Sequence, residues 1–130
     1  MSLLLHIETA TQNCSVSLSD NGKLLALKEE TGKYTHAENL SLFIKSVLEE
    51  SGVEFKQLSA VSVSKGPGSY TGLRIGVSTA KGICFALDIP LISVDTLKNM
   101  AHGVVSQGIE ADLYCPMIDA RRMEVYAEIY

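Results

Sequence analysis

Apolar and polar positions alternate in short runs over the first thirty residues of the chain. Leu3–Glu8 is an apolar run of strand length, and Cys14–Ser19 alternates apolar with small polar side chains. Asp20-Asn21-Gly22 is a tight-turn signal, which predicts Lys23–Glu30 as the returning strand of a hairpin. The chain is therefore expected to open with three antiparallel strands.

The apolar positions then take up the period of a helix. Thr35-His36-Ala37-Glu38 fits a capping box, in which Thr35 caps the helix and Glu38 reaches back to it. Gly52 is a typical helix stop. The apolar stripe between them consists of Leu40, Phe43, Ile44, Val47 and Leu48. This spacing predicts an amphipathic helix.

Strands and helices alternate through the rest of the chain. The order βββαβαβαββ predicts an α/β fold with a mixed sheet, with one main unit at 1–108 and the start of a second at 109–130. The expected elements are a strand at Ala60–Ser64, a helix at about Thr71–Leu87, a strand at Leu91–Val94, a helix that Asp95 caps and that ends near Gln107-Gly108, and two strands at Leu113–Ile118 and Met123–Ile129 joined by Asp119–Arg122.

Composition and charge narrow the class of protein. The 130 residues are 46% apolar with a formal net charge of -4, which is typical of a soluble globular protein and argues against free-standing nucleic-acid binding. No secretory signal and no apolar run of membrane-spanning length is present, so we expect a cytoplasmic protein. Cys14, Cys84 and Cys115 lie far apart and are expected to act as small core residues in a reduced compartment.

The segment with the clearest functional signal is Lys65–Gly76, which reads KGPGSYTGLRIG. Its four glycines lie between a predicted strand and a predicted helix, where backbone N–H groups can approach an anion or another stretch of backbone. It lacks the spacing of a Walker loop, and Gly72 stands one place late for a dinucleotide fingerprint. The residues that could hold an anion or nucleotide are Gly66, Gly68, Ser69 and Arg74.

The helix after this loop carries two further signals. Arg74 lies in its first turn, where the helix dipole disfavours a cation by about 0.3–1 kcal/mol, so Arg74 either faces an anion or is a solvated surface residue. A ridge of small residues runs along the helix at every fourth position: Gly72, Gly76, Ala80 and Cys84. The ridge packs either against the chain's own sheet or against a helix of another chain.

No catalytic residue and no metal site stands out. His36 has Leu40 where a second metal ligand would lie one turn later, and no other histidine or cysteine is near it in sequence. His6 is expected to be a structural residue with satisfied hydrogen bonds. No nucleophile has an obvious base, and Glu8 and Asp119 are acidic residues that a sheet edge could bring together near a ligand.

Three segments form a recognisable pattern: Ile7-Glu8-Thr9-Ala10-Thr11 followed by CSVSL, then GPGSYTGLRIG, then Ile118-Asp119-Ala120-Arg121 with Glu124-Val125-Tyr126. This pattern closely resembles the TsaB (YeaZ) family over essentially the whole chain. The resemblance implies an actin-like ATPase, ribonuclease H-like subdomain with the order βββαβαβα, followed by the first strands of a second subdomain. Members of this family belong to the system that makes threonylcarbamoyladenosine at adenosine 37 of certain tRNAs, and they were formerly described as glycoprotease-like.

The resemblance also implies a role. In this family the protein is a non-catalytic accessory subunit that binds a larger, TsaD-like catalytic partner, or forms a homodimer in isolation, and it meets tRNA only through the complex. No intrinsic cofactor or metal is implied, although ATP or ADP could be shared at the interface with the partner. The first two helices form that interface, and the matching residues of this sequence are Leu40, Phe43, Gly72, Leu73, Arg74, Gly76 and Ala80.

Two departures from the wider superfamily bear on catalysis. Where its ATPases carry an aspartate and a glycine-rich phosphate turn, this chain has Glu8 and then Thr9-Ala10-Thr11-Gln12-Asn13, which argues against autonomous ATP hydrolysis. Family members usually continue well beyond Tyr130, so a fragment or a short relative is expected. The alternative is a nucleotide-binding enzyme, either an ATPase or kinase of the same superfamily or a dinucleotide-binding domain built on Gly66–Gly72.

Overall fold

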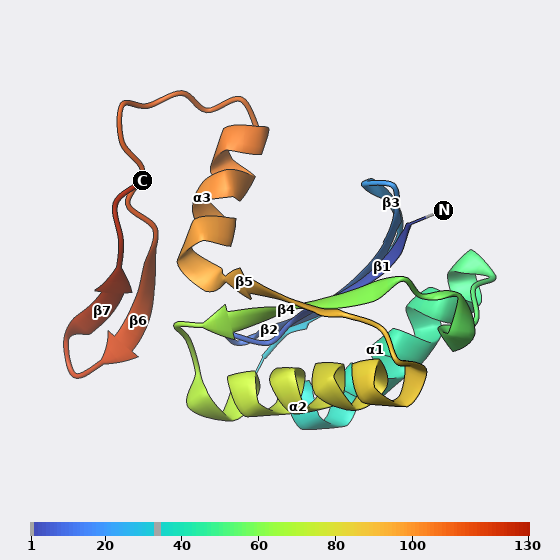
Figure 1. The fold of residues 1–130 in the computed structure, drawn as a ribbon. Helices are drawn as coiled ribbons and strands as arrows, with labels where there is room; N and C mark the ends of the chain where they lie inside the picture. The colour runs from blue at the N-terminus through green and yellow to red at the C-terminus, as the bar shows by residue number, and fades with distance from the viewer. Residues whose placement is uncertain (1, 33–34) are drawn as a thin grey trace.

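A five-stranded sheet with two helices on one face forms the main body of the molecule (Figure 1). This computed structural model describes residues 2–32 and 35–130. The elements are β1 (Leu3–Glu8), β2 (Asn13–Asp20), β3 (Lys23–Thr31), α1 (Thr35–Ser51), the short 3-10 helix η1 (Phe55–Gln57), β4 (Ala60–Gly66), α2 (Tyr70–Leu87), β5 (Leu91–Asp95), α3 (Thr96–Ser106), β6 (Met117–Arg121) and β7 (Glu124–Ala127).

The sheet is mixed, with the strand order β3-β2-β1-β4-β5. β1 pairs antiparallel with β2 and parallel with β4, and β5 adds to β4 in parallel. The predicted hairpin turn between β2 and β3 is confirmed, because Asn21 and Gly22 have φ values of 50° and 83°, the left-handed pair that a tight hairpin requires. The α/β fold with a mixed sheet is therefore as the sequence predicts.

The core lies between the sheet and the pair α1 and α2, which Figure 1 shows on the same side of the sheet. Alternate residues of β1 and β2 point into it, and the predicted stripe of α1 covers them. Four stripe residues are buried and Phe43 is partly buried. Burial of each such aliphatic side chain contributes roughly 1.5–3 kcal/mol. The buried four are Leu40, Ile44, Val47 and Leu48.

Local signals set most helix ends as predicted. α1 stops before Gly52, whose φ is 65°, and α3 begins after Asp95, whose carboxylate accepts the N–H groups of Leu97 and Lys98. The predicted capping box falls on Thr35, whose side chain lies outside the described part of the chain.

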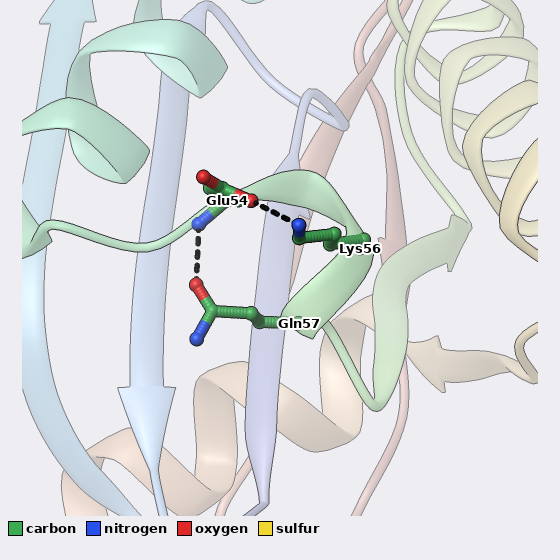
Figure 2. Close-up of polar contacts among 3 residues, drawn as sticks. All are labelled: Glu54, Lys56 and Gln57. Carbon is green, nitrogen blue, oxygen red and sulfur yellow. Dashed lines mark hydrogen bonds and ion pairs between the residues drawn. The ribbon is translucent and has the colours of Figure 1, made fainter.

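The connection from α1 to β4 is closed by its own polar contacts. The backbone N–H of Glu54 donates to Oε1 of Gln57 at 2.8 Å, and Nζ of Lys56 lies 3.0 Å from Oε2 of Glu54 (Figure 2). Leu58 follows and is buried against the core, which brings the chain to the start of β4.

The C-terminal hairpin differs from its prediction in the bounds of its strands and in the position of its turn. Its strands are shorter, and the turn lies at Arg121-Arg122-Met123 rather than at Asp119–Arg122. These three residues have φ values of 67°, 54° and 63°, and the Asp119 carboxylate accepts the N–H of Arg121 at 2.8 Å, which holds the turn at its later position. In Figure 1 this hairpin stands apart from the main sheet, beyond α3; the predicted division at residue 108 stays a prediction.

The cysteines are only partly as predicted. Cys14 and Cys84 are buried, and burial raises the pKa of both thiols. Cys115 is exposed, because it lies in the segment before the C-terminal hairpin and not in the core, so its prediction as a core residue is wrong. Among residues 2–32 and 35–130, no helix is long and apolar enough to cross a membrane.

Candidate docking surface on helices α1 and α2

The glycine loop between β4 and α2 is closed by the chain's own β1–β2 loop. The N–H of Ser69 donates to the carbonyl oxygen of Ala10 at 2.7 Å. Gly68 lies so close to Ala10 that a methyl group on it would overlap the Ala10 carbonyl oxygen. The glycine loop is therefore packed against another stretch of backbone, and that backbone belongs to the same chain.

The ridge on α2 is likewise used inside the chain. Gly72, Gly76 and Ala80 are buried. Oγ1 of Thr9 donates to the carbonyl oxygen of Gly72 at 2.6 Å, and a methyl group on Gly72 or Gly76 would overlap Thr9. The ridge therefore packs inside the chain: Gly72 and Gly76 lie on Thr9, just after β1, and Ala80 lies in the core. These three residues and Leu40, which is 2% exposed, are thus buried and do not lie on the exposed surface of the chain; their contact with a partner stays a prediction.

The predicted anion site does not fit a nucleotide phosphate. Oγ of Ser69 accepts the N–H of Gly72 as the cap of α2, and the N–H of Ser69 is already bound to Ala10. A β-carbon on Gly68 would overlap Ala10, and one on Gly66 would contact the side chain of Leu73. The Ser69 groups of this loop are thus engaged within the chain, which argues against a phosphate cradle here; anion binding at Arg74 stays a prediction.

Arg74 is a surface residue. Its guanidinium lies 5.6 Å from the centre of the Tyr70 ring, within range of a cation–π contact, and within the described part of the chain it forms no ion pair. Within the described part of the chain Arg74 is therefore exposed and lies against Tyr70, and its contact with an anion from a ligand or a partner stays a prediction.

The face of α2 opposite the ridge is exposed. Tyr70 and Phe85 are 75% and 91% exposed, and a shallow groove of about 360 Å³ lies beside Arg74. On α1, Leu42 is 63% exposed and points away from the stripe that packs on the sheet. We call the following set the outer face: Leu42, Tyr70, Arg74, Ser78, Lys81 and Phe85.

Among the predicted interface residues, only Arg74 belongs to this outer face. Leu73 and Phe43 are half-buried beside it. Tyr70, Ser78, Lys81 and Phe85 were missed, although their spacing of four, four, three and four residues through Arg74 places them on one face of a helix. A helical wheel of α2 places these residues opposite the glycine ridge, and this is the signal that could have identified them.

The other face of the sheet carries a polar groove of about 510 Å³ around His6 and Glu8. Nδ1 of His6 lies 2.6 Å from Oγ of Ser62, and Nε2 lies 2.8 Å from Oγ of Ser19. Burial lowers the pKa of His6. The prediction of a structural histidine with satisfied hydrogen bonds is confirmed. Ser62 lies against this imidazole, and the neighbouring backbone N–H groups of β1, β2 and β4 are engaged in the sheet ladders.

The acidic residues singled out by sequence serve local structure. The Glu8 carboxylate accepts the N–H of Ala10 at 3.0 Å and the hydroxyl of Ser64. Asp119 is bound to the N–H of Arg121 in the separate C-terminal hairpin. Within residues 2–32 and 35–130, no group of three or more His, Cys, Asp or Glu side chains is arranged to hold a metal ion.

Comparison with known proteins identifies the family. The sequence model described as "TsaD: tRNA N6-adenosine threonylcarbamoyltransferase" matches residues 29–129. The solved structure "YeaZ from Pseudomonas aeruginosa" matches all of this chain with a TM-score of 0.90 at 35% identity. The chain belongs to the TsaB (YeaZ) family. Two curated relatives named "tRNA threonylcarbamoyladenosine biosynthesis protein TsaB", from Escherichia coli and Haemophilus influenzae, are 36% and 35% identical, each over 95% of this chain.

The match covers only part of these relatives. The chain spans about half of the curated TsaB proteins, 52% and 51% of their lengths, and 60% of the YeaZ structure. The structure of Thermus thermophilus RuvC matches 85% of this chain and 73% of that chain with a TM-score of 0.52 at 13% identity, which is a likeness of fold alone. The fold is the actin-like, ribonuclease H-like one that the TsaB resemblance implies.

Proposed function

We propose that this chain carries the partner-binding helices of a non-catalytic accessory subunit, which binds a TsaD-like catalytic protein in the synthesis of threonylcarbamoyladenosine in tRNA. Membership of the TsaB family and the names of the relatives support the pathway. The observation that carries the binding role is the outer face, where Tyr70, Phe85 and Leu42 are exposed on two helices that each bury their opposite side in the core.

The geometry favours binding over catalysis. An exposed tyrosine with an arginine against its ring is typical of a binding hot spot, since Tyr and Arg are enriched there, and Phe85 extends the same face about three turns further along α2. The glycine loop, filled by Ala10, argues against the alternative of a nucleotide-binding enzyme built on Gly66–Gly72. ATP or ADP would then be held by the partner or at the interface. The net charge of -4 supports contact with tRNA through the partner rather than through this chain.

The outer face is also the surface through which the chain would form a homodimer in isolation. Two copies would pair the same helices, as an isologous contact requires. A TsaD-like partner would compete for that surface, so adding it should dissociate the homodimer. The predicted cytoplasmic location follows from the same pathway and belongs to this proposal.

Affinity measurements with a TsaD-family protein from the same organism test the proposal. We expect Arg74→Glu and Phe85→Ser each to weaken binding at least about tenfold, because interface hot spots typically cost 2 kcal/mol or more when truncated. Lys98→Glu on α3 is the matched control, since it reverses one exposed charge away from the outer face. Equal affinity of all three variants and the parent would refute the proposed docking surface.

A further inference from the structure

We infer that Thr9 and His36 are positioning residues for partner binding, because they hold the first turns of α1 and α2 on one loop and so fix how the two helices present the outer face. The inference rests on the proposed function. The loop is Thr9–Gln12, between β1 and β2, and neither Thr9 nor His36 belongs to the outer face.

Thr9 fixes the position of α2. It is 1% exposed, and its hydroxyl donates to the carbonyl oxygen of Gly72 in the first turn. Its carbonyl oxygen lies where a methyl group on Gly72 would be, and its Oγ1 lies where one on Gly76 would be. The first two turns of α2 therefore rest on Thr9 at backbone distance. A rotation or slide of the helix would bring it into collision with that residue.

His36 fixes α1 to the same loop. Its Nε2 lies 2.5 Å from the carbonyl oxygen of Thr11. A carbonyl oxygen only accepts, so Nε2 carries the proton and the tautomer is set by this contact. The ring edge also lies 3.2–3.3 Å from the position of a methyl group on Gly72. The imidazole is thus wedged between the loop and the start of α2.

The loop itself is anchored from two other sides. The N–H of Ala10 donates to the Glu8 carboxylate, and its carbonyl oxygen accepts from Ser69. Among the described residues, no side-chain hydrogen bond or ion pair joins α1 directly to α2. The polar connection between the two helices therefore runs through Thr9–Gln12, and loosening either contact frees one helix relative to the other.

Four variants isolate this role from simple stability. Thr9→Val keeps the shape of the side chain but removes the donor, and Thr9→Ser keeps the donor. His36→Leu removes the N–H that reaches Thr11, and His36→Gln keeps an N–H at a similar reach. Val16→Ala in the β2 core is the matched control, because it removes buried carbon without touching the hydrogen bonds of Thr9 or His36.

The experiment measures the dissociation constant for the TsaD-family partner at a temperature where circular dichroism shows every variant folded. We expect Thr9→Val and His36→Leu to bind about tenfold more weakly, within the usual range of coupling between sites. Thr9→Ser, His36→Gln and Val16→Ala should stay within about threefold of the parent.

Two outcomes overturn the inference. One is parental affinity in Thr9→Val and His36→Leu, and the other is an equal loss in Val16→Ala, which would mean that stability alone is measured. Arg74→Glu, run alongside, separates the two proposals. If only Arg74→Glu loses binding, the proposed function stands and the positioning role fails; if Arg74→Glu also binds as the parent does, both fail.

Discussion

The close approach of Gly76 to Thr9 makes Gly76→Ala an unusual helix substitution. Replacing a glycine inside a helix by alanine normally stabilises it by about 1 kcal/mol. At position 76 the added methyl group would overlap Oγ1 of Thr9, which is buried and bound to the carbonyl oxygen of Gly72. We therefore expect the sign of the usual effect to reverse.

The size of the effect can be worked from these contacts. Displacing the Thr9 hydroxyl leaves a buried donor unsatisfied, at roughly 1–3 kcal/mol. Forcing a methyl group into a packed site costs about 1–3 kcal/mol more. After the gain in helix propensity, the net loss is about 3 kcal/mol, which corresponds to a fall in Tm of about 10 °C for a chain of 130 residues.

Thermal and urea unfolding of five proteins would check this reasoning: the parent, Gly76→Ala, Gly82→Ala, Thr9→Ala and the Thr9→Ala, Gly76→Ala double variant. Gly82→Ala is the control on the same helix: Gly82 is exposed and has no atom within 4 Å of the added methyl group, so we expect about 0.5–1 kcal/mol of stabilisation. In a Thr9→Ala background, Gly76→Ala should lose its penalty and become neutral or stabilising. A Gly76→Ala protein as stable as the parent, or an equal penalty in both backgrounds, would refute the argument.

Two further predictions concern capping and pH. Asp95→Ala removes the carboxylate that accepts the N–H groups of Leu97 and Lys98, and it should lower the free energy of unfolding by about 1 kcal/mol in urea titrations; an unchanged midpoint would contradict the role of the cap. Burial holds the pKa of His6 below its ordinary value of 6.5, so the unfolded chain binds the extra proton first as the pH falls. The contribution of His6 to the free energy of unfolding should therefore be complete above pH 6.5. Below that pH it should decrease by at most about 1.4 kcal/mol per pH unit. His6→Gln should remove that part of the slope between pH 5 and 7, and an unaltered slope would show that other groups cause it.

Local signals predicted most of the fold, because they act over a few residues. Asp95 and Gly52 mark helix ends through backbone groups next to them in sequence, and the alternation in β1 and β2 fixes which side faces the helices. The C-terminal turn was misplaced because three consecutive non-glycine residues, Arg121-Arg122-Met123, adopt positive φ, which their side chains do not signal.

The candidate site was harder to predict for a physical reason. The four-residue spacing shows that Gly72 and Gly76 share a face of α2, but not what that face meets. The residue that this face meets is Thr9, which lies 63 residues before Gly72 and is brought to it by the pairing of β1 with β4. Because the ridge is buried, the opposite face of α2 is the exposed one, and the residues available to a partner are Tyr70 and Phe85 rather than the glycines.

The contact between Thr9 and α2 also restricts which residues positions 9 and 76 can carry together during evolution. Position 76 has no room for a β-carbon while position 9 carries a branched hydroxyl side chain. A homologue that acquires alanine at position 76 must give up volume at position 9, and one that keeps threonine at position 9 must keep glycine at position 76. The side-chain sizes at positions 9 and 76 are therefore expected to covary across the family, and an alignment of homologous sequences would show this compensation.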